Sequence, residues 1–380
     1  MKLVLCRADR SCERTGIVLI GAAIIAIGGT APPATAQVTQ QWHAREFQDN
    51  VFGVDDAVDI AYWKDGNVEW VYVTGYQTTA SGATVFATHK YDANFSGPGE
   101  NEPVVSRFYP DPPASATGTN KAVAIAVDPV SGDVYFTGES IDTSGMMNGL
   151  DYVTIKYDKD LDPHDDWIMA GHPGAVVRWD NPIFAGPGSH DRPVDIALGK
   201  RFEGNPFDNV IGITGRSYGG PATKYDIVTV LMEAGTGDPW SDWGNVGWGM
   251  GARSFNGDAD SNDSAAELDV IWTGDIPEAP PGVDTYVAGT TRYLHSGQPN
   301  DDIVTIKYDT AGSPAAPFGW TNVYNGPMNA DDVATAMVVD FIKYKAVFVC
   351  GYTPHYVAGA SASSGGGSGT GARSGGGALR

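Results

Sequence analysis

Alternating apolar and polar residues mark the segment "DIVTIKYD" at 302–309 as a β-strand. Its even positions, Val304, Ile306 and Tyr308, are apolar, whereas its odd positions are mixed. A period of two is typical of a strand with one buried face. Related segments, "VFATHKYD", "DYVTIKYD" and "DIVTVLME", begin at positions 85, 151 and 226. The chain therefore contains four copies of nearly the same strand.

A second apolar strand, ending in glycine, accompanies these copies. The segments "VYVTG", "VYFTG", "IGITG", "TYVAG" and "VFVCG" end at Gly75, Gly138, Gly215, Gly289 and Gly351, which we call the closing glycines. Successive closing glycines are 63, 77, 74 and 62 residues apart. Spacing this regular predicts a repeated structural unit.

Each unit also contains an alanine-rich strand and a looser strand with aromatic residues. The alanine-rich strands read "DDAVDIAY", "KAVAIAVD", "RPVDIALG", "SAAELDVI" and "DVATAMVVD" and precede the closing glycines. Their small side chains suit a crowded position. The aromatic strand is clearest in "GWTNVYNG" at 319–326 and weaker in "VVSRFYP" at 104–110. One unit is therefore four short strands.

This order of strands predicts an all-β fold, a β-propeller of about five four-stranded antiparallel blades with the alanine-rich strand nearest the axis. Tandem sandwich domains need about 100 residues each, and the turns of a β-helix are much shorter. The observed spacing favours the propeller.

The two ends of the repeat region bear on whether the ring closes. Trp42 and Phe47 predict an orphan outer strand that completes the last blade and covers its edge. In the fifth unit, either "HYVAGAS" is a stunted third strand or the ring is incomplete. The Gly/Ser-rich segment 359–380 is predicted to be disordered, or marks a truncated or frame-shifted product.

The first 36 residues have the pattern of a signal peptide. Lys2, Arg7, Arg10 and Arg14 precede the apolar stretch "GIVLIGAAIIAIGG", and small residues end at Ala36. The apolar stretch is shorter than the roughly 20 residues of a membrane span. We expect residues 1–36 to be removed on export, residues 37–358 to form the propeller, and the protein to act in the periplasm or outside the cell.

The net charge and the number of cysteines exclude some binding partners and an internal disulfide. The formal net charge is −22, which repels nucleic acid and anionic lipid. Beyond the signal only Cys350 remains, so an internal disulfide is excluded in a mature monomer. We expect a monomer that does not insert into a membrane and whose partner is an unknown protein or glycan.

The combination of "VYVTG", "DYVTIKYD" and "AIAVD" resembles the SBBP repeat of exported bacterial proteins, named for a seven-bladed β-propeller. The resemblance covers roughly residues 42 to 352 and implies the propeller fold. It implies no shared catalytic residues, and this chain shows five units where the family's name implies seven.

An acidic stretch, "DADSNDSAAELD" at 258–269, resembles a calcium-binding loop. Oxygen-bearing side chains occupy its first, third, fifth, seventh and twelfth positions, namely Asp258, Asp260, Asn262, Ser264 and Asp269. The sixth position is Asp263 instead of glycine, and the twelfth is Asp instead of the longer Glu. The alternative is a solvated acidic loop between blades.

An acidic or amide residue also stands just ahead of each alanine-rich strand. These residues are Asp55, Asp56, Asn120, Asp191, Asp263, Asp331 and Asp332. They either hold a cation or polar ligand at one mouth of the central channel, or cap turns through backbone hydrogen bonds.

Tryptophans gather in the glycine-rich segment "DPWSDWGNVGWGMG". Trp240, Trp243 and Trp248 form either an exposed platform for stacking on sugar rings or part of the outer strand of the third blade.

The sequence has no H-E-x-x-H motif and no glycine-rich phosphate-binding loop, and its histidines do not fall at metal-ligand spacing. We therefore expect a non-enzymatic binding or structural module. The alternative is a secreted calcium-dependent carbohydrate-active enzyme, a lyase or hydrolase that uses loop carboxylates.

Overall fold

A computed structural model describes most of the repeat region. It covers residues 55–95, 102–110, 118–141, 149–182, 190–199, 210–243, 251–259, 261–273, 282–295, 298–314, 319–340 and 346–353. The predicted signal peptide, the predicted closing strand around Trp42 and the Gly/Ser tail lie outside the described residues.

The described strands form five antiparallel sheets, which we call blades, and strands that are consecutive in sequence are neighbours within each sheet. The first blade comprises β1 (Asp56–Asp65), β2 (Val68–Thr78), β3 (Thr84–Asp92) and β4 (Val105–Tyr109). The second comprises β5 (Asn120–Val127), β6 (Val134–Ile141), β7 (Leu150–Tyr157) and β8 (Val176–Trp179). The third comprises β9 (Arg192–Leu198), β10 (Val210–Gly220), β11 (Lys224–Glu233) and β12 (Ala252–Phe255). The fourth comprises β13 (Ser264–Trp272), β14 (Val283–His295), β15 (Gln298–Tyr308) and β16 (Trp320–Tyr324), and the fifth has β17 (Val333–Asp340) and β18 (Ala346–Tyr352).

Helical structure is minor. A short α-helix, α1 (Asp165–Met169), and a 3-10 turn at Pro173–Ala175 connect β7 to β8, and a second 3-10 turn at Ser241–Trp243 precedes β12. Within the described ranges, no helix has the length and apolar character needed to cross a membrane.

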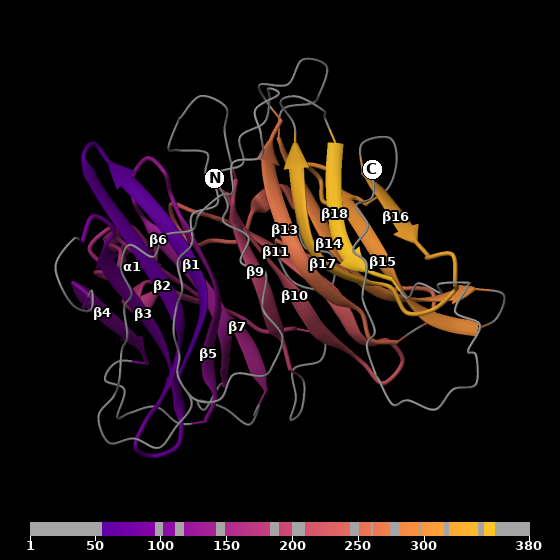
Figure 1. Cartoon of the computed structure of the whole chain (residues 1–380), viewed down its shortest axis with the longest axis horizontal. Helices are drawn as coiled ribbons and strands as arrows, with labels where there is room; N and C mark the ends of the chain where they lie inside the picture. The colour runs from indigo at the N-terminus through magenta and orange to yellow at the C-terminus, as the bar shows by residue number, and fades with distance from the viewer. Residues whose placement is uncertain are drawn as a thin grey trace, which may run out of the picture.

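The blades follow one another in chain order, from indigo to yellow in Figure 1. Their first strands, β1, β5, β9, β13 and β17, contact each other in that order, so we call them the inner strands. These are the alanine-rich strands of the sequence, and Ala122, Ala124, Ala265 and Ala334 are buried on them. The all-β, propeller-like architecture is thus confirmed, although only two strands of the fifth blade are described.

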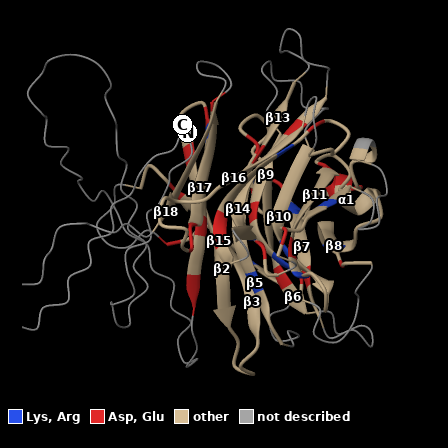
Figure 2. Ribbon diagram, turned by 90° about the vertical axis from the view of Figure 1, so that its right-hand side faces the viewer, with Lys and Arg blue, Asp and Glu red and all other residues tan. Residues whose placement is uncertain are grey.

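Large side chains fill the space between neighbouring blades. Phe86 of β3 meets Phe136 of β6 with ring centroids 6.2 Å apart, and Trp243 meets Tyr308 of β15 at 5.4 Å. The strands carry both acidic and basic residues, coloured red and blue in Figure 2, and the chain as a whole has a formal net charge of −22. The apolar core therefore lies between the sheets.

The same close backbone contact requires a glycine at each of these positions. Each closing glycine pairs with the second residue of the inner strand, or with the third in β5, where the register shifts at a β-bulge, as at Pro193 opposite Gly215. A Cβ on Gly215 would lie 2.1 Å from the Arg192 carbonyl oxygen, and one on Gly75 would lie 1.9 Å from the Asp56 carbonyl oxygen. Only glycine permits this approach of the two backbones.

We expect Gly215→Ala to lower the free energy of unfolding by about 2 to 4 kcal/mol, because the added methyl group displaces the inner-strand backbone. Gly235→Ala is the matched control, since a Cβ there meets nothing within 4 Å. Thermal or urea melts of the two variants measure the difference. Equal melting of Gly215→Ala and the control would show that the close approach does not constrain the fold.

Candidate functional site

A buried aspartate at the start of each of three inner strands accepts a hydrogen bond from the backbone of the preceding blade. Asp191 Oδ2 accepts a hydrogen bond from the Asn181 backbone N–H at 2.9 Å, and Asp263 Oδ2 accepts one from the Gly257 N–H at 2.7 Å. Asp332 accepts the equivalent bond at the start of β17. These carboxylates satisfy backbone donors where the preceding outer strand ends, so the capping interpretation holds for them.

Other members of the same sequence pattern also bind backbone or hydroxyl groups. Asp55 Oδ1 accepts from the Thr78 N–H at 2.9 Å, and Asp331 Oδ1 accepts from the backbone N–H of Asp301 at 3.1 Å. Asn120 Oδ1 accepts from the Ser140 hydroxyl at 2.7 Å. Asp56 lies at the start of β1 and lines a pocket described below.

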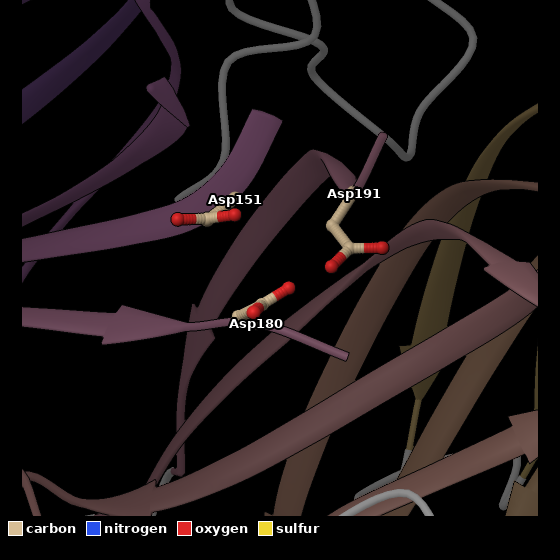
Figure 3. A group of neighbouring side chains, drawn as sticks. All are labelled: Asp151, Asp180 and Asp191. Atoms are coloured by element: carbon tan, nitrogen blue, oxygen red, sulfur yellow. The ribbon is translucent and has the colours of Figure 1, made fainter. Parts of the chain in front are cut away.

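The junction between the second and third blades gathers three carboxyl groups, Asp151, Asp180 and Asp191, which we call the junction cluster. Asp151 lies on β7, Asp180 directly follows β8, and Asp191 directly precedes β9. One oxygen from each lies within 4.8 Å of the others, and Figure 3 shows the three carboxylates facing a common space. Such an arrangement could hold a metal ion.

The next two junctions repeat this arrangement with one change. Asp226 pairs with Ser217 across the third blade, and Asp302 pairs with Thr291 across the fourth, just as Asp151 pairs with Ser140. The corresponding sets are Asp226, Asn256 and Asp263, and Asp302, Asn325 and Asp332. Asparagine stands in both where the junction cluster has Asp180, so the third carboxylate distinguishes that cluster.

Burial is the main influence on the pKa of Asp191. Asp191 is only 1% exposed, and this burial raises its pKa to about 7, helped by the negative charges of Asp180 and Asp151 and opposed by hydrogen bonds from Ser217 and Asn181. In the described part of the chain its Oδ1 has no hydrogen-bond partner.

A cation, Arg178, contacts one member of this group. The Arg178 guanidinium donates to Asp151 Oδ2 at 2.6 Å and to the Ser140 carbonyl at 3.0 Å. Three carboxyl groups in one place concentrate negative charge, which a proton or a bound cation would balance. Carboxylate oxygens are ligands for hard divalent ions.

The predicted calcium loop is not formed as one ligand set. β13 begins at Ser264, so Ser264 and Asp269 stand five residues apart on an extended strand, roughly 17 Å at about 3.3 Å per residue. One ion cannot bind both, which corrects the prediction. Asp258 and Asn262 are exposed, and Asp260 lies outside the described residues. Asp263, the residue at the position that should be glycine, is buried in a junction instead.

The three tryptophans of the glycine-rich segment differ in what the structure shows of them. Trp243 is 1% exposed and packs on Tyr308 and under the Arg253 guanidinium, so its ring belongs to the core and offers no stacking face. Trp240 is half-buried against the same core, and Trp248 lies outside the described residues. The outer strand of the third blade is β12, which follows this segment.

A pocket of about 360 Å³ opens where four inner strands begin, and we call it the axial pocket. Its polar lining comes from two repeated positions. These are the inner-strand residues whose carbonyl oxygens face the closing glycines and the residues that follow those glycines: Asp56, Lys121, Arg192, Ser264, Tyr76, Glu139 and Arg216.

Comparisons with known proteins add little. No family model and no curated protein matches the chain. Among solved structures, a mannose phosphorylase from Leishmania mexicana, MPT-4 in complex with phosphate, matches 78% of this chain and 80% of its own at 10% identity and a TM-score of 0.30. A TM-score this low carries no argument about fold or function.

The raised pKa of Asp191 predicts a pH-dependent contribution to stability in the presence of a chelator. Its folded value of about 7 exceeds the unfolded value of about 3.9, so this contribution is complete below pH 4 and is lost as pH rises to 7. We expect Asp191→Asn to remove that pH dependence, because asparagine does not titrate. Asn120 stands at the corresponding position of β5.

Melts of wild type and Asp191→Asn between pH 4 and 8 measure this as a difference between the two proteins. Identical pH profiles would contradict the assignment of a raised pKa to Asp191.

Proposed function

We propose that this chain is an exported, non-enzymatic β-propeller of the kind its SBBP-like repeats suggest, acting as a binding or structural module in the envelope or outside the cell. One observation carries the proposal. Repeated positions inside the blades are nearly uniform, whereas those that line the axial pocket differ from blade to blade.

The contrast is clear when the blades are compared. The closing glycine is the same in all five, whereas the residue after it is Tyr76, Glu139, Arg216, Thr290 or Tyr352. The residue that starts the bulge contact is likewise Asp56, Lys121, Arg192, Ser264 or Val333. Uniform positions maintain the fold, and varied positions at a concave surface are what a recognition site requires.

We propose calcium as the ion of the junction cluster, with a structural role. Asp151 and Asp180 belong to the second blade and Asp191 leads into the third, so an ion among them would link two blades. The partnerless Oδ1 of Asp191 and the excess negative charge favour a hard cation with several oxygen ligands, and calcium accepts irregular oxygen geometry.

Calcium is expected to raise the melting midpoint by several degrees relative to chelator at equal ionic strength. A ligand at 100 times its Kd adds about 2.7 kcal/mol to the folded state. Asp180→Asn should abolish this rise and still fold, because Asn256 and Asn325 occupy the same place in the other junctions.

Asp165→Asn is the matched control for that experiment. It removes one negative charge from the same blade, at an exposed position in α1. Calcium should stabilise this control as it does wild type. A full calcium response in Asp180→Asn would exclude the junction cluster as the calcium site.

Incubation with neutral and acidic polysaccharides tests the non-enzymatic part of the proposal. We expect no new reducing ends or unsaturated products in calcium-containing buffer. Product formation that Asp-to-Asn variants abolish would instead establish a carbohydrate-active enzyme.

A further inference from the structure

The axial pocket concentrates positive charge on a strongly acidic protein. The chain has 24 Lys and Arg against 46 Asp and Glu. Three of those cations, Lys121, Arg192 and Arg216, line this one pocket together with two carboxylates, Asp56 and Glu139. The local balance is therefore positive where the overall balance is −22.

Among the residues that the structure describes, two of the three cations form no ion pair with a carboxylate. Arg192 Nε lies 3.3 Å from Glu139 Oε2. Lys121 Nζ lies over the Tyr76 ring at 4.4 Å, and the Arg216 guanidinium lies over the Tyr225 ring at 5.1 Å. Neither forms an ion pair within the described residues. Aromatic rings hold both side chains in place and leave their charge available to an anion.

The rest of the pocket supplies hydrogen-bond acceptors and apolar surface. Asp56 is exposed and can accept bonds from hydroxyl groups, and Ser264 can donate or accept. Val58 and Val194 line the same pocket and are 43% and 39% exposed. A volume of about 360 Å³ lies near the lower end of the range for small-molecule sites.

We propose that the axial pocket binds an acidic sugar unit, its carboxylate held by Lys121 and Arg216 and its hydroxyls by Asp56 and Ser264. The inference rests on the proposed role as a binding module and names the class of its ligand. A uronate combines a carboxylate, several hydroxyls and apolar C–H faces on a compact ring, which matches the groups around the pocket. A guanidinium and an ammonium converging on one carboxylate form charge-assisted hydrogen bonds.

Titration calorimetry at low salt with D-galacturonate, D-galactose and acetate tests the proposal. Galacturonate is expected to bind, whereas galactose lacks the carboxylate and acetate lacks the ring. Lys121→Gln and Arg216→Gln should each weaken galacturonate binding about tenfold or more. Lys224→Gln, an exposed lysine of the third blade, removes the same charge away from the pocket and should bind as wild type.

Each of the other possible results contradicts a specific part of the proposal. Equal binding of galactose would reject the role of the carboxylate, and equal binding of acetate would reduce the pocket to a simple anion site. Wild-type affinity in both pocket variants, or no galacturonate binding, would reject the pocket as the site. Calcium melts of the same variants separate this result from the proposed function, because the junction cluster is a different set of residues.

Discussion

The close approach of two backbones at each closing glycine is the constraint on which the blades depend. The inner strands must pass near one another around the axis, and a β-bulge presses each one against its neighbouring strand. A Cβ at Gly138 would stand 2.2 Å from the Lys121 carbonyl oxygen, so a side chain is excluded there. The inner strands are rich in alanine because the same crowding leaves no room for larger side chains. Larger residues are displaced to the space between the sheets, where they form the core.

The sequence was sufficient for the features that depend on local periodicity. The period of two, the closing glycines and the alanine-rich strands predicted which segments pair and which lie innermost, and the structure confirms both. The junction cluster was not predicted, because Asp151 and Asp191 are 40 residues apart and meet only where two blades join. The repeat did contain a signal, because an aspartate stands at the matching position of three of the third strands, at 151, 226 and 302.

Two candidate sites had two interpretations each, and their surroundings in the fold favour the structural one. The spacing of Asp258 and its neighbours suggested a loop, but β13 starts inside that stretch and carries Asp269 away along the strand. The surroundings of Trp243 left open an exposed platform or a place in the third blade, and its ring lies in the core against Tyr308. In both cases, packing between units outweighed the local composition.

The junctions show how little separates a structural contact from an ion site. Asn256 and Asn325 stand in junctions that have two carboxyl groups, and Asp180 stands in the junction that has three. Asparagine and aspartate codons differ by a single base, so one point mutation in a duplicated unit converts one kind of junction into the other. The main-chain hydrogen bonds that join the blades form with either residue. Repeats that arise by duplication can therefore gain or lose cation binding at one junction at a time.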